Sequence, residues 1–155
     1  MTRPEPDAVV LSAWVLMTDQ QTADRLEIAE LLATYSWAMT DKDWDAWQGV
    51  FMAGASVDYS TAGGPVGTPA EAAAGLSAMM AAFDVVLSQC SNLVLTFASP
   101  DTAVGRSMYR MVMRLSGSDD ASFMEAQGEY RDEFTRTPGG WRISRRFEQL
   151  HYVRA

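Results

Sequence analysis

The chain has 155 residues, of which 48% are hydrophobic and 21% charged, and these values are typical of one globular domain. Its formal net charge of −8 and pI near 4.5 would repel a phosphate backbone, and no Lys/Arg cluster is dense enough to overcome this repulsion. Nucleic acid is therefore excluded as a partner. Ten Met and five Trp indicate an adaptable, aromatic-lined interior, which could be plain core or an apolar ligand pocket.

Residues 1–21 are expected to form an N-terminal extension ahead of the domain. The apolar run 8–17 is too short to span a bilayer and follows Glu5 and Asp7, so we expect it to pack on the domain or on a partner subunit. The single cysteine, Cys90, has no partner for an intrachain disulfide. These features predict a cytoplasmic protein without a membrane segment.

The first predicted helix spans residues 22–39. Its apolar residues recur at helical spacing, which places Ile28, Leu32, Tyr35 and Met39 on one buried face. The pattern therefore predicts that the hydroxyl-bearing ring of Tyr35 points into the interior.

Three aspartates at alternate positions follow this helix: Asp41, Asp43 and Asp45. A calcium loop beginning at Asp41 would require Gly at its sixth position and Glu at its twelfth, where this chain has Ala46 and Met52. We interpret the aspartates as a helix junction, with Asp43 as the N-cap of a second helix over residues 43–51.

A brief strand is expected at residues 55–59, followed by a Gly-rich turn. Thr68 is a candidate N-cap, Pro69 suits a first helical position and Glu71 suits the first turn, so a third helix is expected to run to about Phe83.

After this helix the pattern changes to apolar and aromatic segments separated by turn residues, which predict strands at 92–97, 103–115, 123–135 and 141–153. Helices followed by long strands describe an α+β domain over residues 22–155, in which a curved antiparallel sheet wraps around the helices.

Several short segments, in this order, resemble one known superfamily: residues 31–45, Phe51, residues 55–59, residues 130–134 and residues 140–143. The chain resembles the SnoaL-like branch of the nuclear transport factor 2-like superfamily, which includes polyketide cyclases, scytalone dehydratase, bile-acid dehydratase and ketosteroid isomerase. The resemblance covers roughly residues 22–152. It implies a cone-shaped, strongly curved, mainly antiparallel sheet closed by three helices around an apolar cavity, usually in a homodimer joined through the outer face of the sheet.

The resemblance also implies roles for Tyr35 and Asp132. Tyr35 falls where ketosteroid isomerase and bile-acid dehydratase have a functional tyrosine, and Asp132 falls where the isomerase has the acid of its oxyanion hole. Strand alternation independently puts Asp132 on one face with Tyr130 and Phe134. Inside a cavity, a desolvated Asp132 could donate a hydrogen bond together with Tyr35 to a substrate oxygen. The alternative is a structural aspartate satisfied by backbone or by an arginine.

The general base implied by the resemblance is missing. The base aspartate of the isomerase aligns with Tyr59, the dehydratase aspartate aligns with Thr40, and the dehydratase histidines are absent. Tyr59 and Asp41 are therefore the candidate catalytic groups beside Tyr35 and Asp132, with Asp58 a further candidate. The sole histidine, His151, is interpreted as a surface or structural residue.

The expected substrate-binding wall combines residues of the first helix and of the strands. It consists of Trp37, Met39, Cys90, Met111, Met113, Tyr130 and Phe134. No phosphate-binding loop, Cys/His metal spacing or serine elbow is present, so we expect neither a cofactor nor a metal.

Three functions fit these features. The first is a dehydratase, isomerase or cyclase that acts on a hydrophobic, carbonyl-bearing molecule such as a polyketide or steroid, with Tyr35 and Asp132 polarising its oxygen. The second is a base-free cyclase that folds a polyene by cavity shape. The third is a non-catalytic ligand-binding or dimerisation module.

Overall fold

The computed structural model describes residues 19–118 and 122–155. Within these ranges, three α-helices precede the long strands: α2 (Asp19–Asp41), α3 (Trp44–Gly49) and α4 (Pro69–Met80), with a short 3-10 turn, η1 (Ser60–Ala62), between the last two. The apolar run 8–17 and most of the expected N-terminal extension lie outside the described residues. Within the two described ranges, no helix has the length and apolar character needed to cross a membrane.

Two helix starts are fixed by the side chains expected to fix them. The carboxylate of Asp43 accepts a hydrogen bond from the Ala46 backbone N–H at 2.9 Å and caps α3. At α4, the hydroxyl of Thr68 accepts from the Glu71 N–H, while the Glu71 side chain accepts from the Thr68 N–H at 2.8 Å. This reciprocal pair is a capping box, which satisfies two N–H groups that the helix itself cannot pair.

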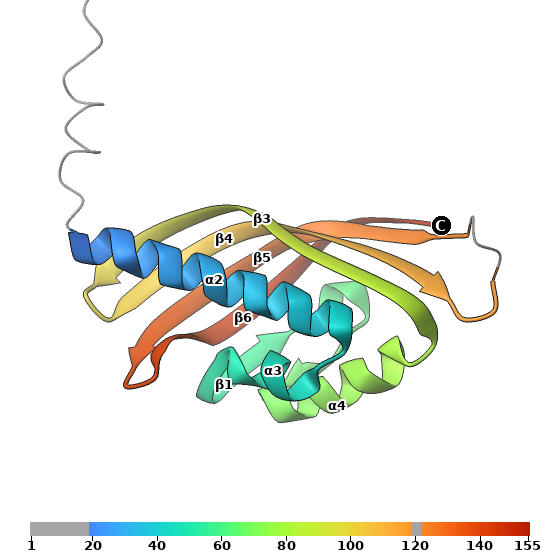
Figure 1. Ribbon diagram of the computed structural model, residues 1–155, viewed down its shortest axis with the longest axis horizontal. Coiled ribbons are helices and arrows are strands. Elements are labelled where there is room, and N and C mark those ends of the chain that lie inside the picture. The colour runs from blue at the N-terminus through green and yellow to red at the C-terminus, as the bar shows by residue number, and fades with distance from the viewer. Residues whose placement is uncertain (1–18, 119–121) are drawn as a thin grey trace, which may run out of the picture.

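The helices cover one face of a six-stranded sheet in the order β2-β1-β6-β5-β4-β3 (Figure 1). The strands are β1 (Phe51–Asp58), β2 (Val66–Gly67), β3 (Phe83–Ser99), β4 (Thr102–Leu115), β5 (Met124–Thr137) and β6 (Gly140–Arg154). All neighbours are antiparallel except β1 and β6, which run parallel. The mixed α+β architecture and the four long strands agree with the expected fold.

β3 begins at Phe83, nine residues before the strand expected at 92–97. In its first half, the buried Val86 and Ser88 alternate with more exposed neighbours. Polar side chains occur on both faces and interrupt the apolar pattern, so the sequence did not predict this part of the strand. The strand pairing shifts between Ser91 and Val94, where Asn92 adopts a left-handed backbone with φ of 55°. This bulge bends β3 over the long helix α2.

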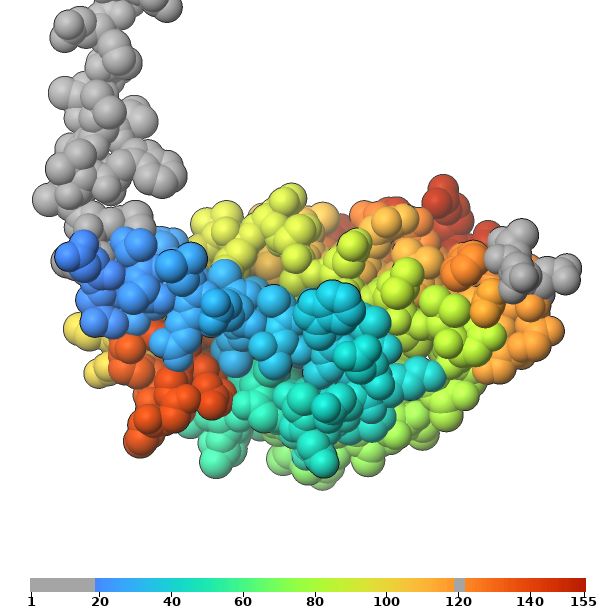
Figure 2. Space-filling view, viewed as in Figure 1, coloured from blue at the N-terminus to red at the C-terminus, as the bar shows by residue number. Residues whose placement is uncertain are grey.

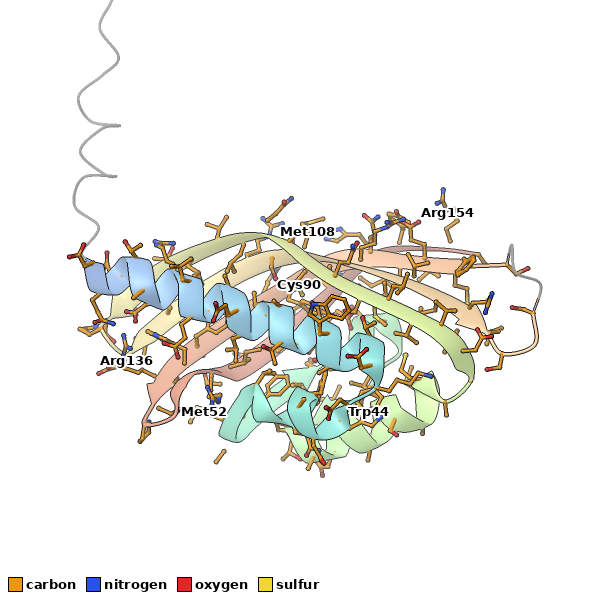
Figure 3. The ribbon with its side chains drawn as sticks, viewed as in Figure 1. Trp44, Met52, Cys90, Met108, Arg136 and Arg154 are labelled. Carbon is orange, nitrogen blue, oxygen red and sulfur yellow. The ribbon has the colours of Figure 1, made fainter. Side chains whose placement is uncertain are left out.

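The start of α2 is fastened to the turn between β5 and β6 by a buried aspartate. The Asp24 carboxylate accepts hydrogen bonds from Arg136 Nη2 at 2.7 Å and from Trp141 Nε1 at 3.1 Å. Figure 3 labels Arg136 at this end of the molecule, beneath the first turns of α2. These hydrogen bonds fix the start of α2 across the sheet. In the space-filling view, α2, α3 and α4 form one continuous surface (Figure 2).

Candidate functional site

A cavity of about 190 Å³ lies inside the cone, between the concave face of the sheet and the helices α2 and α4. Its wall is mainly apolar, and methionines from both helices and from two strands supply much of it: Met39, Met79, Met80, Met111, Met113 and Met124. Methionine side chains are flexible and polarisable, so such a wall adapts to the shape of an apolar ligand. The cavity therefore suits a small hydrophobic molecule.

Three tyrosine hydroxyls meet at the polar end of this cavity. Tyr35 on α2 is central, with its hydroxyl oxygen 3.2 Å from that of Tyr59 and 3.3 Å from that of Tyr130. The helical face expected for Tyr35 is the one it occupies, because Ile28, Leu32 and Met39 are buried beside it. Burial raises the pKa of the Tyr35 phenol and raises those of the other two well above the usual value, so all three stay protonated as potential donors.

Glu148 on β6 brings a carboxyl group to the same cavity. It is the register partner of Tyr130 on β5, so the two side chains stand next to each other on the concave face. Burial raises the pKa of Glu148 to about 6, although the nearby Tyr109 hydroxyl and the charge of Arg146 act in the opposite direction. A carboxyl group with this pKa can both accept and release a proton near neutral pH.

A bulge in β6 turns Glu148 inward. Phe134 pairs with Ile143 but Glu133 pairs with Arg145, so Ser144 is an extra residue, and the alternation of inward side chains passes from odd to even numbers.

The turn η1 then holds the strand on the far side of the bulge. The Thr61 hydroxyl donates to the Glu148 carbonyl oxygen at 2.9 Å and accepts from the Leu150 N–H at 2.8 Å.

Behind the tyrosines lies a fully buried ion pair. Arg146 donates from Nε and Nη2 to the two carboxylate oxygens of Asp132, each at 2.7 Å. Its guanidinium carbon lies 4.1 Å from the ring centroid of Tyr35 and 4.0 Å from that of Tyr130, which is cation–π geometry on both sides. Burial alone would lower the pKa of Arg146, but the charge and hydrogen bonds of Asp132 outweigh it and hold that pKa well above the usual value.

The structure brings six of the expected site residues to the cavity wall: Tyr35, Met39, Tyr59, Met111, Met113 and Tyr130. Asp132 shares the concave face but does not line the cavity, since Arg146 occupies both of its oxygens and stands against the tyrosine rings. The arrangement matches the alternative of a structural aspartate satisfied by an arginine. Direct donation from Asp132 to a substrate, as first expected, does not fit this geometry.

Four other expected site residues lie elsewhere. Trp37 follows Tyr35 by two positions and points to the opposite side of α2, where it is 67% exposed. Asp41 is exposed at the end of α2, and Phe134 is buried beyond Asp132. Cys90, labelled in Figure 3 beside α2, lines a separate groove between that helix and β3.

The remaining titratable candidates also lie away from the cavity wall. The Asp58 side chain accepts from the Ser60 N–H at 3.0 Å, and this contact lowers its pKa. His151 is half exposed on the outer face of the sheet, 3.8 Å from Glu129. Among residues 19–118 and 122–155, no three His, Cys, Asp or Glu side chains are grouped so as to hold a metal ion.

Sequence reasoning missed Glu148 as a cavity residue. Period-two alternation continued from Trp141 and Ile143 points Glu148 to the outside, because the extra residue at Ser144 has no signature in the sequence.

A family model described as a SnoaL-like domain matches residues 20–147. The chain is 33% identical over 133 residues to the uncharacterized protein Rv2910c of Mycobacterium tuberculosis, an alignment that covers 86% of this chain and 89% of that protein.

Solved structures with the same fold include proteins from three organisms. A protein of Novosphingobium aromaticivorans, provisionally named a scytalone dehydratase, has a TM-score of 0.79 at 20% identity. The match covers 89% of this chain and 91% of that one. The Kfla4162 protein of Kribbella flavida gives 0.76 at 26% identity, covering 86% and 94%. The hexachlorocyclohexane dehydrochlorinase LinA-type3 of Novosphingobium barchaimii gives 0.73 at 18% identity, covering 87% and 91%. At these identities the first and third show the fold alone.

Proposed function

The chain belongs to the SnoaL-like domain family, and on this premise we propose that it is a cofactor-independent enzyme that moves a proton next to the carbonyl group of a small, hydrophobic molecule. The observation that carries the proposal is a single carboxyl group, Glu148, in an apolar cavity beside a cluster of three tyrosine hydroxyls. Neighbours in the fold named as a dehydratase and a dehydrochlorinase support the same class, because both names describe eliminations.

Tyr35 supplies the hydrogen-bond donor in this proposal. Its oxygen can accept from both Tyr59 and Tyr130 and still direct its own proton at a substrate oxygen. Two accepted hydrogen bonds polarise that O–H group, so it donates more strongly to an oxygen that gains negative charge. Arg146 assists from behind the rings, and Asp132 acts by holding Arg146 in place.

Glu148 supplies the base. Its ionised carboxylate takes a proton from the carbon next to the carbonyl, and the electron pair moves into the carbonyl to give an enolate whose oxygen faces Tyr35. The enolate then collapses in one of two ways. In a ketone with a β,γ double bond, return of the proton from Glu148 to the γ-carbon moves the double bond next to the carbonyl. In a ketone with a β-hydroxyl group, that hydroxyl leaves with the same proton as water.

The proposal is tested by hydrogen–deuterium exchange at the α-carbon of cyclic ketones, followed by NMR in D₂O. A panel from cyclohexanone to decalone brackets the size of the cavity. We expect the protein to accelerate exchange, Glu148→Gln to remove about 100-fold or more of the acceleration, and the exposed control Glu133→Gln to retain it. Equal exchange rates with the parent and with Glu148→Gln would exclude the base. An open cavity rather than a filled cone already favours an enzyme over a module that only dimerises.

We also propose a homodimer joined through the outer face of β3–β6. Exposed Val94 and Val104 lie there next to Phe147 in a shallow hollow, and a second copy would cover them. Light scattering should give twice the chain mass, and Val104→Arg should shift the protein toward the monomer. A monomeric parent protein would refute this part.

A further inference from the structure

Glu148 has no countercharge of its own among the described residues. It takes part in no ion pair there, and the positive charge nearest in the chain, Arg146, uses Nε and Nη2 on Asp132 while its plane is held between two tyrosine rings. Asp132 and Arg146 cancel each other. The cluster therefore carries one net negative charge when Glu148 is ionised, and this charge lies at the cavity wall.

The other polar atoms at the wall are suited to receive hydrogen bonds. They are the hydroxyl oxygens of Tyr35, Tyr59, Tyr109 and Tyr130, and the Tyr109 hydroxyl lies close enough to Glu148 to lower the pKa of that carboxyl group. Among the residues that the structure describes, no Lys, Arg or His side chain lines the cavity. An ammonium group has three N–H donors, which one carboxylate and one or two phenol oxygens can satisfy.

The rest of the cavity determines the body of such a ligand. Its methionine, leucine and alanine wall offers only hydrocarbon contacts, so further polar groups on the ligand would be buried unpaired. A cavity of roughly 150 Å³ is enough for benzene, and the space here is about 190 Å³. One six-membered ring with a short substituent fits this volume.

We propose that the cavity binds a protonated hydrophobic amine, with Glu148 as its counterion. The ammonium group occupies the polar end between Glu148 and the tyrosine hydroxyls, and the hydrocarbon ring lies against the methionines. This inference goes beyond the proposed reaction and does not depend on proton transfer to carbon, because it requires only the charge and shape of the site. Anions of similar size are rejected by the same carboxylate.

The test is calorimetric titration at pH 7.5 with cyclohexylmethylamine and with its neutral counterpart, cyclohexylmethanol. The amine has an ammonium pKa near that of lysine, about 10.4, and is therefore charged. Because a charge-assisted hydrogen bond is roughly twice as strong as a neutral one, we expect the amine to bind about tenfold tighter or more. Glu148→Gln, checked for folding by circular dichroism, should bind the two molecules equally, and Glu133→Gln should keep the preference.

A second measurement uses the parent protein alone. The preference for the amine should diminish between pH 7 and pH 4.5, because Glu148 takes up a proton over this range. The other titratable or charged groups around Glu148 are Arg146 on its own strand, Asp132 and Tyr130 on β5, Tyr109 on β4, Tyr35 on α2 and Tyr59 after β1.

The inference is overturned if neither molecule binds the parent, if the amine binds no tighter than the alcohol, or if Glu148→Gln keeps the preference. Ketone exchange is measured separately, so failure of the proposed reaction with a retained amine preference, or the reverse, distinguishes the two proposals.

Discussion

Replacement of Glu148 by Gln should stabilise the protein at neutral pH while it removes the proposed activity. The parent chain must bury an ionised carboxylate beside phenol hydroxyls and methionines, without a partner of opposite charge. An amide of almost the same shape carries no charge, so its burial requires less desolvation. The substitution therefore separates the stability of the fold from the chemistry of the site.

The magnitude follows from the pKa of this group. Folding raises the pKa of Glu148 from 4.5 to about 6, and at 1.36 kcal/mol per pKa unit this difference is about 2 kcal/mol. A carboxyl group with a raised folded-state pKa stabilises the fold while it is protonated. That contribution is complete below about pH 4.5 and is lost as the pH rises through about 6.

The assay is thermal unfolding of the parent and of Glu148→Gln across pH 4 to 7.5. Titrations of the other groups are common to both proteins, so the difference between their free energies of unfolding isolates Glu148. This difference should grow by about 2 kcal/mol between pH 4 and pH 7 in favour of the variant, which corresponds to about 4–8 °C in Tm for a chain of this size. A Tm difference that stays constant with pH would refute the reasoning, and Glu133→Gln on the outer face provides the matched control.

Other substitutions test the remaining parts of the structure. Tyr35→Phe removes the proposed donor and should lower ketone exchange by about 100-fold, whereas urea unfolding should show a loss of only about 1 kcal/mol for its hydroxyl contacts. Asp132→Asn leaves the buried guanidinium of Arg146 uncompensated and should destabilise the fold by about 3–5 kcal/mol. The double substitution Asp132→Asn with Arg146→Met should recover part of this loss in the same urea experiment. If stability is not recovered, the uncompensated charge is not the cause of the loss. Thr68→Ala breaks the capping box of α4 and should lower the free energy of unfolding by about 1 kcal/mol without a change in ketone exchange. The exchange rate of the parent should rise with pH and level off above about 6, as Glu148 ionises, and a flat profile would remove Glu148 from the reaction.

The fold was readable from the sequence wherever a local signal agreed with the tertiary structure. The apolar stripe of α2 and the side chains of Asp43 and Thr68 are such signals, since a cap or a helical face is decided by residues within a few positions of each other. The first half of β3 was not readable, because polar side chains such as Gln89 and Ser91 limit its apolar run to three residues and because its pairing with β4 is a long-range feature.

The same distinction between local and long-range signals holds for the candidate site. Tyr35 follows from helical periodicity, and it lines the cavity. Glu148 and Arg146 depend on one inserted residue in β6, which exchanges the two faces of the strand without any change in composition. The same insertion turns Arg146 toward Asp132. The buried position of Asp132 was expected from the sequence, but its partner could not be named. The chemistry of the cavity is thus set by a pairing irregularity that only the assembled sheet reveals.

The cluster of three phenols has only three protons, and each hydroxyl hydrogen can rotate. When Tyr35 accepts from both neighbours, the site presents a donor to whatever occupies it. When Tyr35 instead points its proton at Tyr59 or Tyr130, the same oxygen presents a lone pair. The polarity of the site can therefore invert without movement of a heavy atom, so the same tyrosines can serve a carbonyl compound and its hydroxylated counterpart. This property suits a catalyst that must release what it makes.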